Sequence, residues 1–288
     1  MMPGAMAISE ALGERRTVEL PAGTVEYRES GGGAAIVFAH GAAVNGDLWR
    51  DVAPEFSTRF RCIVPDLPLG GHSIPLNPGA DLSLFGAAET LARFIEALDL
   101  SDVTLVANDT GGALSQAVVG RWPARIGRLV LTSCDAFGNY PPKAIGYLKP
   151  TARMPPALWL LSQAMRLKVA QRTPFAYGWA THTPIEPAIM RSYLSSLWNS
   201  SEVRRDFALL LRMARSEDSK EASESVRRFE GPALVAWAAD DRFFPRAHGR
   251  RLAELLPQGE FALVERSRTF IPEDHPGRLV EVLREFLG

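Results

Sequence analysis

The sequence predicts an α/β protein whose mostly parallel, doubly wound sheet is interrupted by an inserted helical lid. Short runs rich in β-branched residues alternate with amphipathic helical segments along most of the chain. Most of these runs lack a strict alternation of apolar and polar residues, which is typical of strands covered on both faces. One long interval contains no such run. Together these observations favour a parallel-rich sheet with helices on both sides and one helical insertion.

The expected strands and helices follow one another in regular order. The strands are a hairpin at 17–29 and single strands at 35–39, 61–65, 103–107, 128–132, 232–237 and 260–265. Apolar residues at helical spacing indicate helices at 83–100, 112–126, 246–257 and 276–288. Strands that alternate with helices in this way form the repeating unit of a parallel sheet.

Residues 137–222 have no convincing strand. They are rich in Trp, Tyr, Met and Leu, and prolines separate their helical stretches. We therefore expect a core domain formed by residues 1–136 and 223–288, with residues 137–222 inserted as a helical lid domain. A lid of this kind excludes water and shapes an apolar pocket.

The charge balance argues against several classes of partner. The 288 residues include 32 Lys and Arg against 33 Asp and Glu, which gives a formal net charge of −1. Because no cationic surplus remains for a phosphate backbone or an anionic membrane, we expect neither nucleic acid nor a membrane as a partner. Residues 1–16 lack the apolar centre of a secretory leader, and no apolar run is long enough to span a bilayer. These features predict a cytoplasmic protein.

Cysteine content and motif spacing give no sign of a metal or a cofactor. Cys62 and Cys134 are too few for a disulfide scaffold and lack metal-ligand spacing, so we expect both to be buried packing residues. Glu273, Asp274 and His275 are consecutive, and consecutive side chains rarely converge on one ion. No nucleotide-binding fingerprint is present. We therefore expect no metal and no cofactor.

Residues 107–112, Ala-Asn-Asp-Thr-Gly-Gly, join an expected strand to an expected helix. The small residues around Asp109 indicate a tight, crowded turn that raises its side chain above the end of the strand. The N–H groups at the start of the helix favour a negative charge at this point. The alternative interpretation is that Asp109 only caps the helix.

The chain resembles the α/β-hydrolase family over nearly its whole length. The matching segments are VFAHG at 37–41, DLPLGGHS at 66–73, the turn at 107–112, the inserted lid and AWAADDRFFP at 236–245. The resemblance implies an α/β-hydrolase fold with Asp109 in the place of the nucleophile. It also implies that the backbone N–H groups of Ala42 and Thr110 stabilise a developing oxyanion, while His40 supports their loop.

An aspartate at the elbow is similar to the haloalkane dehalogenase and epoxide hydrolase branches of the family. In these branches the carboxylate attacks carbon, and a histidine-activated water cleaves the resulting ester. Dehalogenases hold the halide with an aromatic residue and an asparagine where this chain has Thr110 and Ala42, which ranks dehalogenation lower. Epoxide hydrolases carry the motif HG-x-P and lid tyrosines that bind the epoxide oxygen. At the motif this chain reads HGAA. The tyrosines available for that role are Tyr140, Tyr147, Tyr177 and Tyr193.

Thr269 occupies the position at which the family carries its catalytic histidine. A threonine hydroxyl does not accept a proton near neutral pH, so it cannot activate water as imidazole does. No histidine is a clear substitute. His275 is expected at the start of the last helix, facing away from the elbow, and His248 on a solvated helix. His72 is expected on a loop at the elbow's edge of the sheet, and His182 in the lid above the pocket.

The acid member of the site has three candidates. Asp241 is the first, because the family places its acid immediately before a turn like RFFP, and Asp240 is the second. Asp135, after the preceding strand, is the other position from which Asp-nucleophile hydrolases supply this acid. With no histidine to orient, these carboxylates have the alternative roles of capping a helix or pairing with Arg242 or Arg268.

Three functions remain open on the sequence alone. The first is epoxide-hydrolase-like opening or hydrolysis of a small-to-medium apolar substrate by Asp109. The second is a non-hydrolytic isomerase, lyase or cyclase in which Asp109 is a general acid or base. The third is a non-catalytic ligand-binding protein on the same fold. Asn108, Asn45 and a lid tyrosine are candidate polar anchors for the substrate, and a homodimer is left open.

Overall fold

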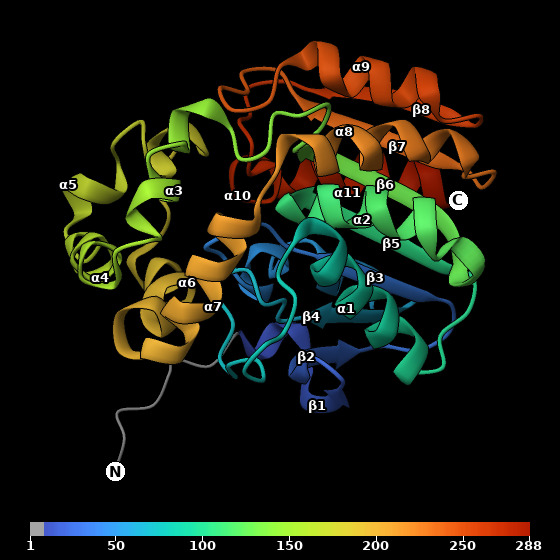
Figure 1. The fold of residues 1–288 in the computed structure, drawn as a ribbon. Coiled ribbons are helices and arrows are strands. Elements are labelled where there is room, and N and C mark those ends of the chain that lie inside the picture. The colour runs from blue at the N-terminus through green and yellow to red at the C-terminus, as the bar shows by residue number, and fades with distance from the viewer. Residues whose placement is uncertain (1–8) are drawn as a thin grey trace.

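An eight-stranded sheet runs through the centre of the structure, a computed structural model that describes residues 9–288 (Figure 1). Residues 1–8 lie outside the described residues. They belong to the N-terminal stretch for which the sequence predicts no secretory leader. The strands are β1 (Glu14–Leu20), β2 (Gly23–Ser30), β3 (Ala35–Ala39), β4 (Arg61–Pro65), β5 (Val103–Asp109), β6 (Ile126–Cys134), β7 (Ala233–Ala238) and β8 (Gly259–Val264). Their order in the sheet is β1-β2-β4-β3-β5-β6-β7-β8. β1 and β2 pair antiparallel, β2 pairs antiparallel with β4, and all later pairs are parallel.

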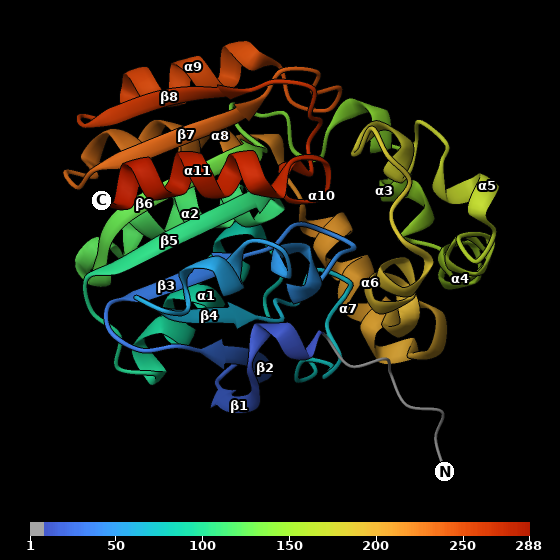
Figure 2. The ribbon, with the colours of Figure 1, turned by 180° about the vertical axis from the view of Figure 1, so that it is seen from behind.

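Helices cover both faces of the sheet. The α-helices are α1 (Leu84–Ala97), α2 (Thr110–Arg121), α3 (Leu148–Thr151), α4 (Pro155–Ala164), α5 (Lys168–Gln171), α6 (Pro187–Asn199), α7 (Ser201–Met213), α8 (Ser216–Ser225), α9 (Arg246–Leu255), α10 (Ile271–Asp274) and α11 (Pro276–Leu287). Short 3-10 helices are η1 (Glu10–Leu12), η2 (Gly46–Trp49), η3 (Ala53–Phe56), η4 (Pro123–Arg125), η5 (Lys143–Ile145), η6 (Tyr177–Trp179) and η7 (Val226–Arg228). Figures 1 and 2 show α1, α2, α8 and α9 on one face and α11 on the other.

The predicted fold class is confirmed. Every residue of β3 and β7 is buried, as expected for strands covered on both faces. The helix predicted at 112–126 is shorter and begins earlier, at Thr110, because Asp109 already caps it. It ends at Arg121, just before Pro123, since proline cannot continue a helix. Cys62 and Cys134 are both buried and free, as predicted.

The helical insertion follows β6 and returns to β7, and it contains no strand. α3, α4, α5, α6 and α7 extend beyond the carboxyl ends of the parallel strands (Figures 1 and 2). α8 is different, because it packs against α2 of the core. The division of the chain into a core and a lid domain at 137–222 remains a prediction, and its second boundary falls inside α8. No helix among the described residues is long and apolar enough to cross a membrane.

Candidate active site

A strained turn at the end of β5 presents Asp109. Its φ is 55°, a backbone conformation that residues with a Cβ seldom adopt, and it is both the last residue of β5 and the N-cap of α2. The turn fits only because its neighbours are small. A Cβ on Gly41 would lie 2.5 Å from the Asp109 Cβ, and a Cβ on Gly111 would lie 2.4 Å from the His40 carbonyl oxygen. The glycines therefore allow two loops to approach closely around one carboxylate.

Two backbone N–H groups hold one oxygen of this carboxylate. The Ala42 N–H donates to Asp109 Oδ1 at 3.1 Å, and the Thr110 N–H donates to the same oxygen at 2.6 Å. These are the two groups that the sequence predicted to stabilise an oxyanion. Burial raises the pKa of Asp109, while the N–H groups of Thr110 and Ala42 lower it by stabilising the charged form. Asp109 is thus a desolvated carboxyl with one oxygen fixed at a helix N-terminus.

An apolar cavity of about 160 Å³ lies between this turn and the helical insertion. Leucines of α4, α6 and α7 form much of its wall, together with Phe243 and Phe270 from the core. The ionisable groups that line it are Asp109, Asp135 and three tyrosines, and no Lys, Arg or His is among its described lining residues. A space of this size accommodates a molecule about as large as benzene.

Asp135 is the second carboxyl of the cavity, and it lies just after β6. It is buried, and its Oδ2 accepts a hydrogen bond from the Thr110 hydroxyl at 3.1 Å. Burial and then the Asp109 carboxylate raise the pKa of Asp135 well above its ordinary value. Its Oδ1 and the hydroxyl of Tyr140 are both buried without a hydrogen-bond partner among the described residues, and both residues line the cavity. Two unsatisfied polar groups in one apolar cavity are unusual and indicate a site for a polar atom of a ligand.

Thr269 lies beside Asp241, and its role in the histidine's place remains a prediction. Its hydroxyl donates to Asp241 Oδ1 at 2.9 Å, and the same oxygen accepts from the N–H groups of Phe243 and Phe244. Burial raises the pKa of Asp241 to about 6, although these three donors oppose the shift. Asn108 lies below this pair rather than in the cavity wall, because its amide donates to the Thr269 carbonyl at 2.8 Å.

The histidines all lie away from the cavity lining. His40 is buried in the loop after β3, where it accepts from the Leu67 N–H at 2.8 Å, and burial lowers the pKa of His40 to about 4. His72 contacts Asp206 of α7, and His182 contacts Asp240 at the surface. His248 packs on Phe137, and His275 precedes α11. None of them is placed to activate a water at Asp109.

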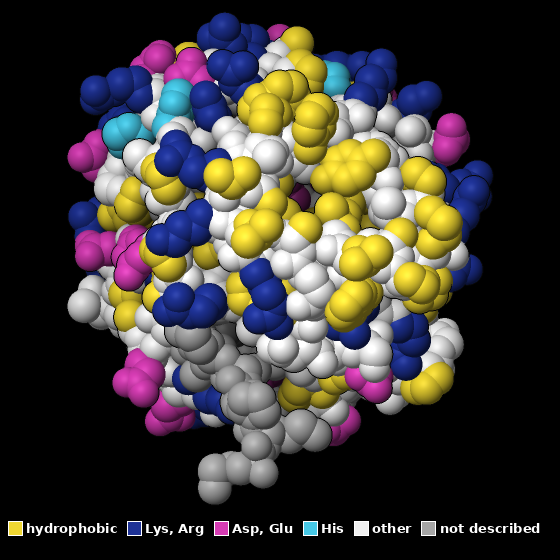
Figure 3. Space-filling model, turned by 90° about the vertical axis from the view of Figure 1, so that its left-hand side faces the viewer, with side chains coloured by type: hydrophobic (Ala, Val, Ile, Leu, Met, Phe, Trp, Pro, Cys, Tyr) yellow, Lys and Arg dark blue, Asp and Glu magenta, His cyan; other side chains and the backbone are white. Residues whose placement is uncertain are grey.

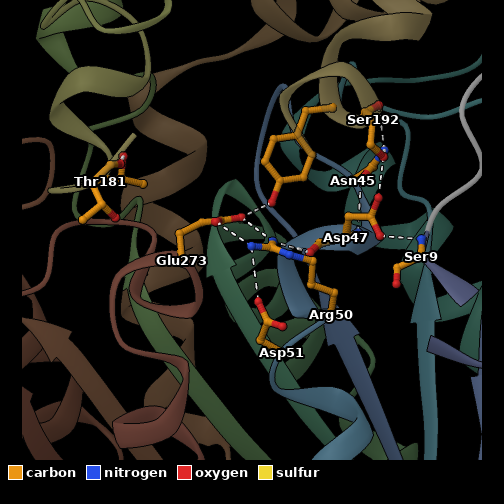
Figure 4. Close-up of polar contacts among 10 residues, drawn as sticks. Ser9, Asn45, Asp47, Arg50, Asp51, Thr181, Ser192 and Glu273 are labelled. Carbon is orange, nitrogen blue, oxygen red and sulfur yellow. Dashed lines mark hydrogen bonds and ion pairs between the residues drawn. The ribbon is translucent and has the colours of Figure 1, made fainter. Parts of the chain in front are cut away.

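A polar network fixes the insertion to the core beside the cavity (Figure 4). Arg50, just after η2, donates to both oxygens of Glu273, at 2.6 and 2.9 Å, and the Tyr193 hydroxyl donates to the same carboxylate. Asn45 donates to the Ser192 carbonyl of α6 at 3.0 Å. Figure 4 shows Asn45, Asp47 and Ser192 converging from η2 and α6. Tyr193 and Asn45, which the sequence put forward as substrate anchors, take part in this network and do not line the cavity.

Three of the four candidate tyrosines, Tyr140, Tyr147 and Tyr177, line the cavity. The Tyr177 hydroxyl donates to the Ala43 carbonyl, one residue after the Ala42 N–H that binds Asp109. The Tyr140 hydroxyl has no hydrogen-bond partner among the described residues.

The two carboxylates of the stretch 273–275 are engaged elsewhere. Glu273 binds Arg50, and Asp274 accepts from the Arg268 N–H. No cluster suited to a metal ion occurs among residues 9–288.

A family model described as the alpha/beta hydrolase fold matches residues 34–276 of this chain. The chain belongs to the α/β-hydrolase family. The predicted superfamily is thereby confirmed, and the protein is an enzyme of the α/β-hydrolase fold. Its assignment to the Asp-nucleophile branch of the family remains a prediction.

Relatives of this α/β hydrolase have several activities. A 2-hydroxy-6-oxononadienedioate/2-hydroxy-6-oxononatrienedioate hydrolase of Paraburkholderia phymatum is 27% identical over 92% of this chain and 91% of that protein. A cis-3-alkyl-4-alkyloxetan-2-one decarboxylase of Xanthomonas campestris pv. campestris is 26% identical over 88% of each chain. Among solved structures, the epoxide hydrolase CorEH superimposes with a TM-score of 0.78 at 18% identity, over 95% of this chain and 98% of that one. At that identity the likeness is evidence for the fold alone.

Proposed function

We propose that this α/β hydrolase opens an epoxide or a similarly strained ring in a small-to-medium apolar molecule, with Asp109 as the nucleophile. The observation that carries the proposal is the fixed orientation of the Asp109 carboxylate. Its Oδ1 is held by the N–H groups of Ala42 and Thr110, which leaves Oδ2 as the atom that attacks carbon. The N–H pair would then receive the oxyanion when the resulting ester is cleaved.

Asp135 supplies the proton for ring opening. Two buried carboxyls in one cavity do not both ionise readily, so the better-stabilised one carries the charge. Asp109 has two backbone N–H donors at a helix N-terminus, whereas Asp135 accepts a single hydroxyl hydrogen bond. Asp135 is therefore the protonated member. When Asp109 Oδ2 bonds to the ring carbon, the C–O bond breaks and the ring oxygen takes the proton of Asp135, with the Tyr140 hydroxyl as a second donor.

The same residue completes the hydrolysis without a histidine. After ring opening Asp135 is a carboxylate, and it can remove a proton from a water that attacks the ester carbon of Asp109, as the acid of retaining glycosidases does. Collapse of the tetrahedral oxyanion breaks the ester C–O bond, and the leaving alkoxide takes the proton of Asp135 to become the product alcohol. The carboxylic acid left at Asp109 then passes its proton to Asp135. Over the whole cycle one epoxide and one water give one diol, and both carboxyls return to their starting protonation states. This route explains how Thr269 can occupy the usual histidine position.

A second candidate is a lyase that needs no water. Its support is that the described residues lining the cavity include no histidine, and that the Xanthomonas relative is named for decarboxylation of a strained four-membered ring. Release of carbon dioxide from such a ring need not consume water. In this reaction the ring bonds C2–C3 and O1–C4 would break to give carbon dioxide and an alkene. Asp109 would attack the ring and be released again, and any proton that Asp135 donates would be returned to it.

The deciding experiment is a single turnover in ¹⁸O water with a panel of apolar epoxides and 3,4-dialkyl oxetan-2-ones. Attack by Asp109 predicts an intact-mass adduct on the enzyme and a first-turnover diol that contains ¹⁶O from the carboxylate. A diol that carries ¹⁸O in the first turnover would mean direct attack by water and would refute the nucleophile. Carbon dioxide release without a diol would favour the lyase, and ligand recovered unchanged from every substrate would favour a binding protein.

A further inference from the structure

One face of the helical insertion gathers the exposed apolar side chains of the molecule. Every large hydrophobic side chain that is exposed among residues 9–288 lies between positions 147 and 175, with Leu160 60% and Val169 82% exposed. These side chains are Tyr147, Met154, Trp159, Leu160, Leu167, Val169 and Phe175. We call this surface the insertion face. Figure 3 shows apolar side chains gathered here around a hollow, with Lys and Arg side chains between them. Contiguous exposed apolar surface of this kind marks a site of interaction.

The same segment is strongly cationic. Residues 137–185 contain no Asp or Glu. Their Lys and Arg residues are Lys143, Lys149, Arg153, Arg166, Lys168 and Arg172. None of these six forms an ion pair with a carboxylate in the described part of the chain, where the ion pairs nearest in sequence involve Arg125 and His182. All except Lys149 are exposed. Their charges are thus available to a partner.

The insertion face is continuous with the candidate active site. Tyr147 and Phe175 are exposed on it and also line the cavity that holds Asp109, and their rings pack edge to face with centroids 6.3 Å apart. The Tyr147 hydroxyl donates to the Phe175 carbonyl at 2.7 Å, which ties the segment before η6 to the residue before α3. An apolar molecule held at this face would therefore meet the cavity without passing through bulk water.

We propose that the insertion face docks on the surface of an anionic lipid bilayer. Exposed Trp, Leu, Val and Phe side chains interleaved with Lys and Arg are the combination that buries apolar groups at the headgroup boundary while the cations meet anionic lipids. The long Lys and Arg side chains can extend from an apolar surface to those headgroups. The chain lies on the membrane and does not span it.

Charge complementarity selects this occupant over a second copy of the chain. A symmetric dimer through the insertion face would place the same six cations against one another without intervening carboxylates, which is unfavourable. The expectation of no membrane partner rested on a net charge of −1 for the whole chain. The acidic residues that balance the total lie outside positions 137–185. The inference does not rest on the proposed reaction.

The test is flotation of the full chain with vesicles of phosphatidylcholine, with and without phosphatidylglycerol. We expect binding to the anionic vesicles that weakens as salt is raised to about 1 M. Lys168→Glu/Arg172→Glu should weaken it by about tenfold or more, since each cation near the surface contributes to binding. Leu160→Asp/Val169→Asp should weaken it as well, because the apolar contribution is lost. All four positions are exposed, so the fold should persist, and circular dichroism checks this.

The matched control is Arg228→Glu/Arg246→Glu, which makes the same change in net charge at exposed positions on η7 and α9. It should leave vesicle binding unchanged. Three outcomes would overturn the inference. These are no binding to anionic vesicles, equal weakening by the control pair, and a dimer in sedimentation that Leu160→Asp/Val169→Asp dissociates. The last would assign the insertion face to a second copy of the chain.

Discussion

The Thr269 hydroxyl donates a hydrogen bond to Asp241 Oδ1 at 2.9 Å. The residue predicted at the family's histidine position is thus bound to the residue predicted as the acid member, and neither lines the cavity that holds Asp109. The hydroxyl uses its proton in this bond, and a threonine oxygen is a very weak base. Asp241 is therefore an acid without a histidine to orient, and the search for a base moves to the other buried carboxyl, Asp135.

Thr269→His should add a second route for ester hydrolysis. Asp241 would accept from the imidazole N–H and orient the ring, as an acid member does in a triad. We expect an Asp109 adduct to clear faster in this variant than in the wild type, measured by intact mass after a pulse of epoxide. Because Thr269 is fully buried, the larger ring should cost about 1–3 kcal/mol of stability.

Thr269→Asn is the control for that variant. Asparagine has a side chain of intermediate size and no basic nitrogen, so it should lower the melting temperature without clearing the adduct faster. Equal adduct lifetimes in Thr269→His and Thr269→Asn would show that an imidazole at this position does not reach the ester.

Asp109→Asn should abolish adduct formation and lower turnover by at least about 1,000-fold, because an amide does not attack carbon. The amide oxygen can still accept from the Ala42 and Thr110 N–H groups, and asparagine tolerates a φ of 55°, so the fold should be kept. Asp99→Asn is a matched control, since Asp99 is an exposed aspartate with a φ of 47°. Full turnover by Asp109→Asn would remove Asp109 from the chemistry.

Asp135→Asn and Tyr140→Phe should separate the two halves of the reaction. Asparagine can accept the Thr110 hydrogen bond but exchanges no proton, so we expect ring opening to slow and the Asp109 ester to persist, with hydrolysis slower by about 100- to 10,000-fold. Tyr140→Phe removes one donor to the ring oxygen and should slow ring opening alone. Rapid-quench mass spectrometry measures both steps. An ester that clears at the wild-type rate in Asp135→Asn would exclude Asp135 as the base.

The elbow could be predicted from sequence because its determinants are local. An apolar strand followed by Asp109, Thr110 and two glycines specifies a crowded turn, and the structure has it at a φ of 55°. The Ala42 and Thr110 N–H groups were predicted from the resemblance to the family, and the structure brings both to Asp109 Oδ1. Short-range sequence thus specifies the turn that presents Asp109.

The rest of the cavity depends on long-range packing that no single-sequence pattern records. Tyr193 was expected to hold substrate, but α6 is rotated so that its hydroxyl meets Glu273. Tyr140 and Asp135 converge on the cavity only because the chain after β6 folds back over it. The cationic insertion face was hidden by averaging charge over the whole chain. A charge count along shorter windows would have revealed it.

Stability should depend on pH through Asp241. Burial raises its pKa to about 6 in the folded protein, above the ordinary value of 3.8 that it regains on unfolding. The folded state therefore binds the proton more tightly, so the contribution of Asp241 to stability falls as pH rises from about 4 to about 6 and stays low above that. Asp241→Asn removes this loss, and its amide oxygen can still accept from the N–H groups of Phe243 and Phe244. We expect the melting temperature of Asp241→Asn relative to that of the wild type to rise from pH 4 to about pH 6 and then level off, while exposed Asp99→Asn shows no such trend. A difference that stays constant across this range would mean that Asp241 keeps an ordinary pKa in the folded protein.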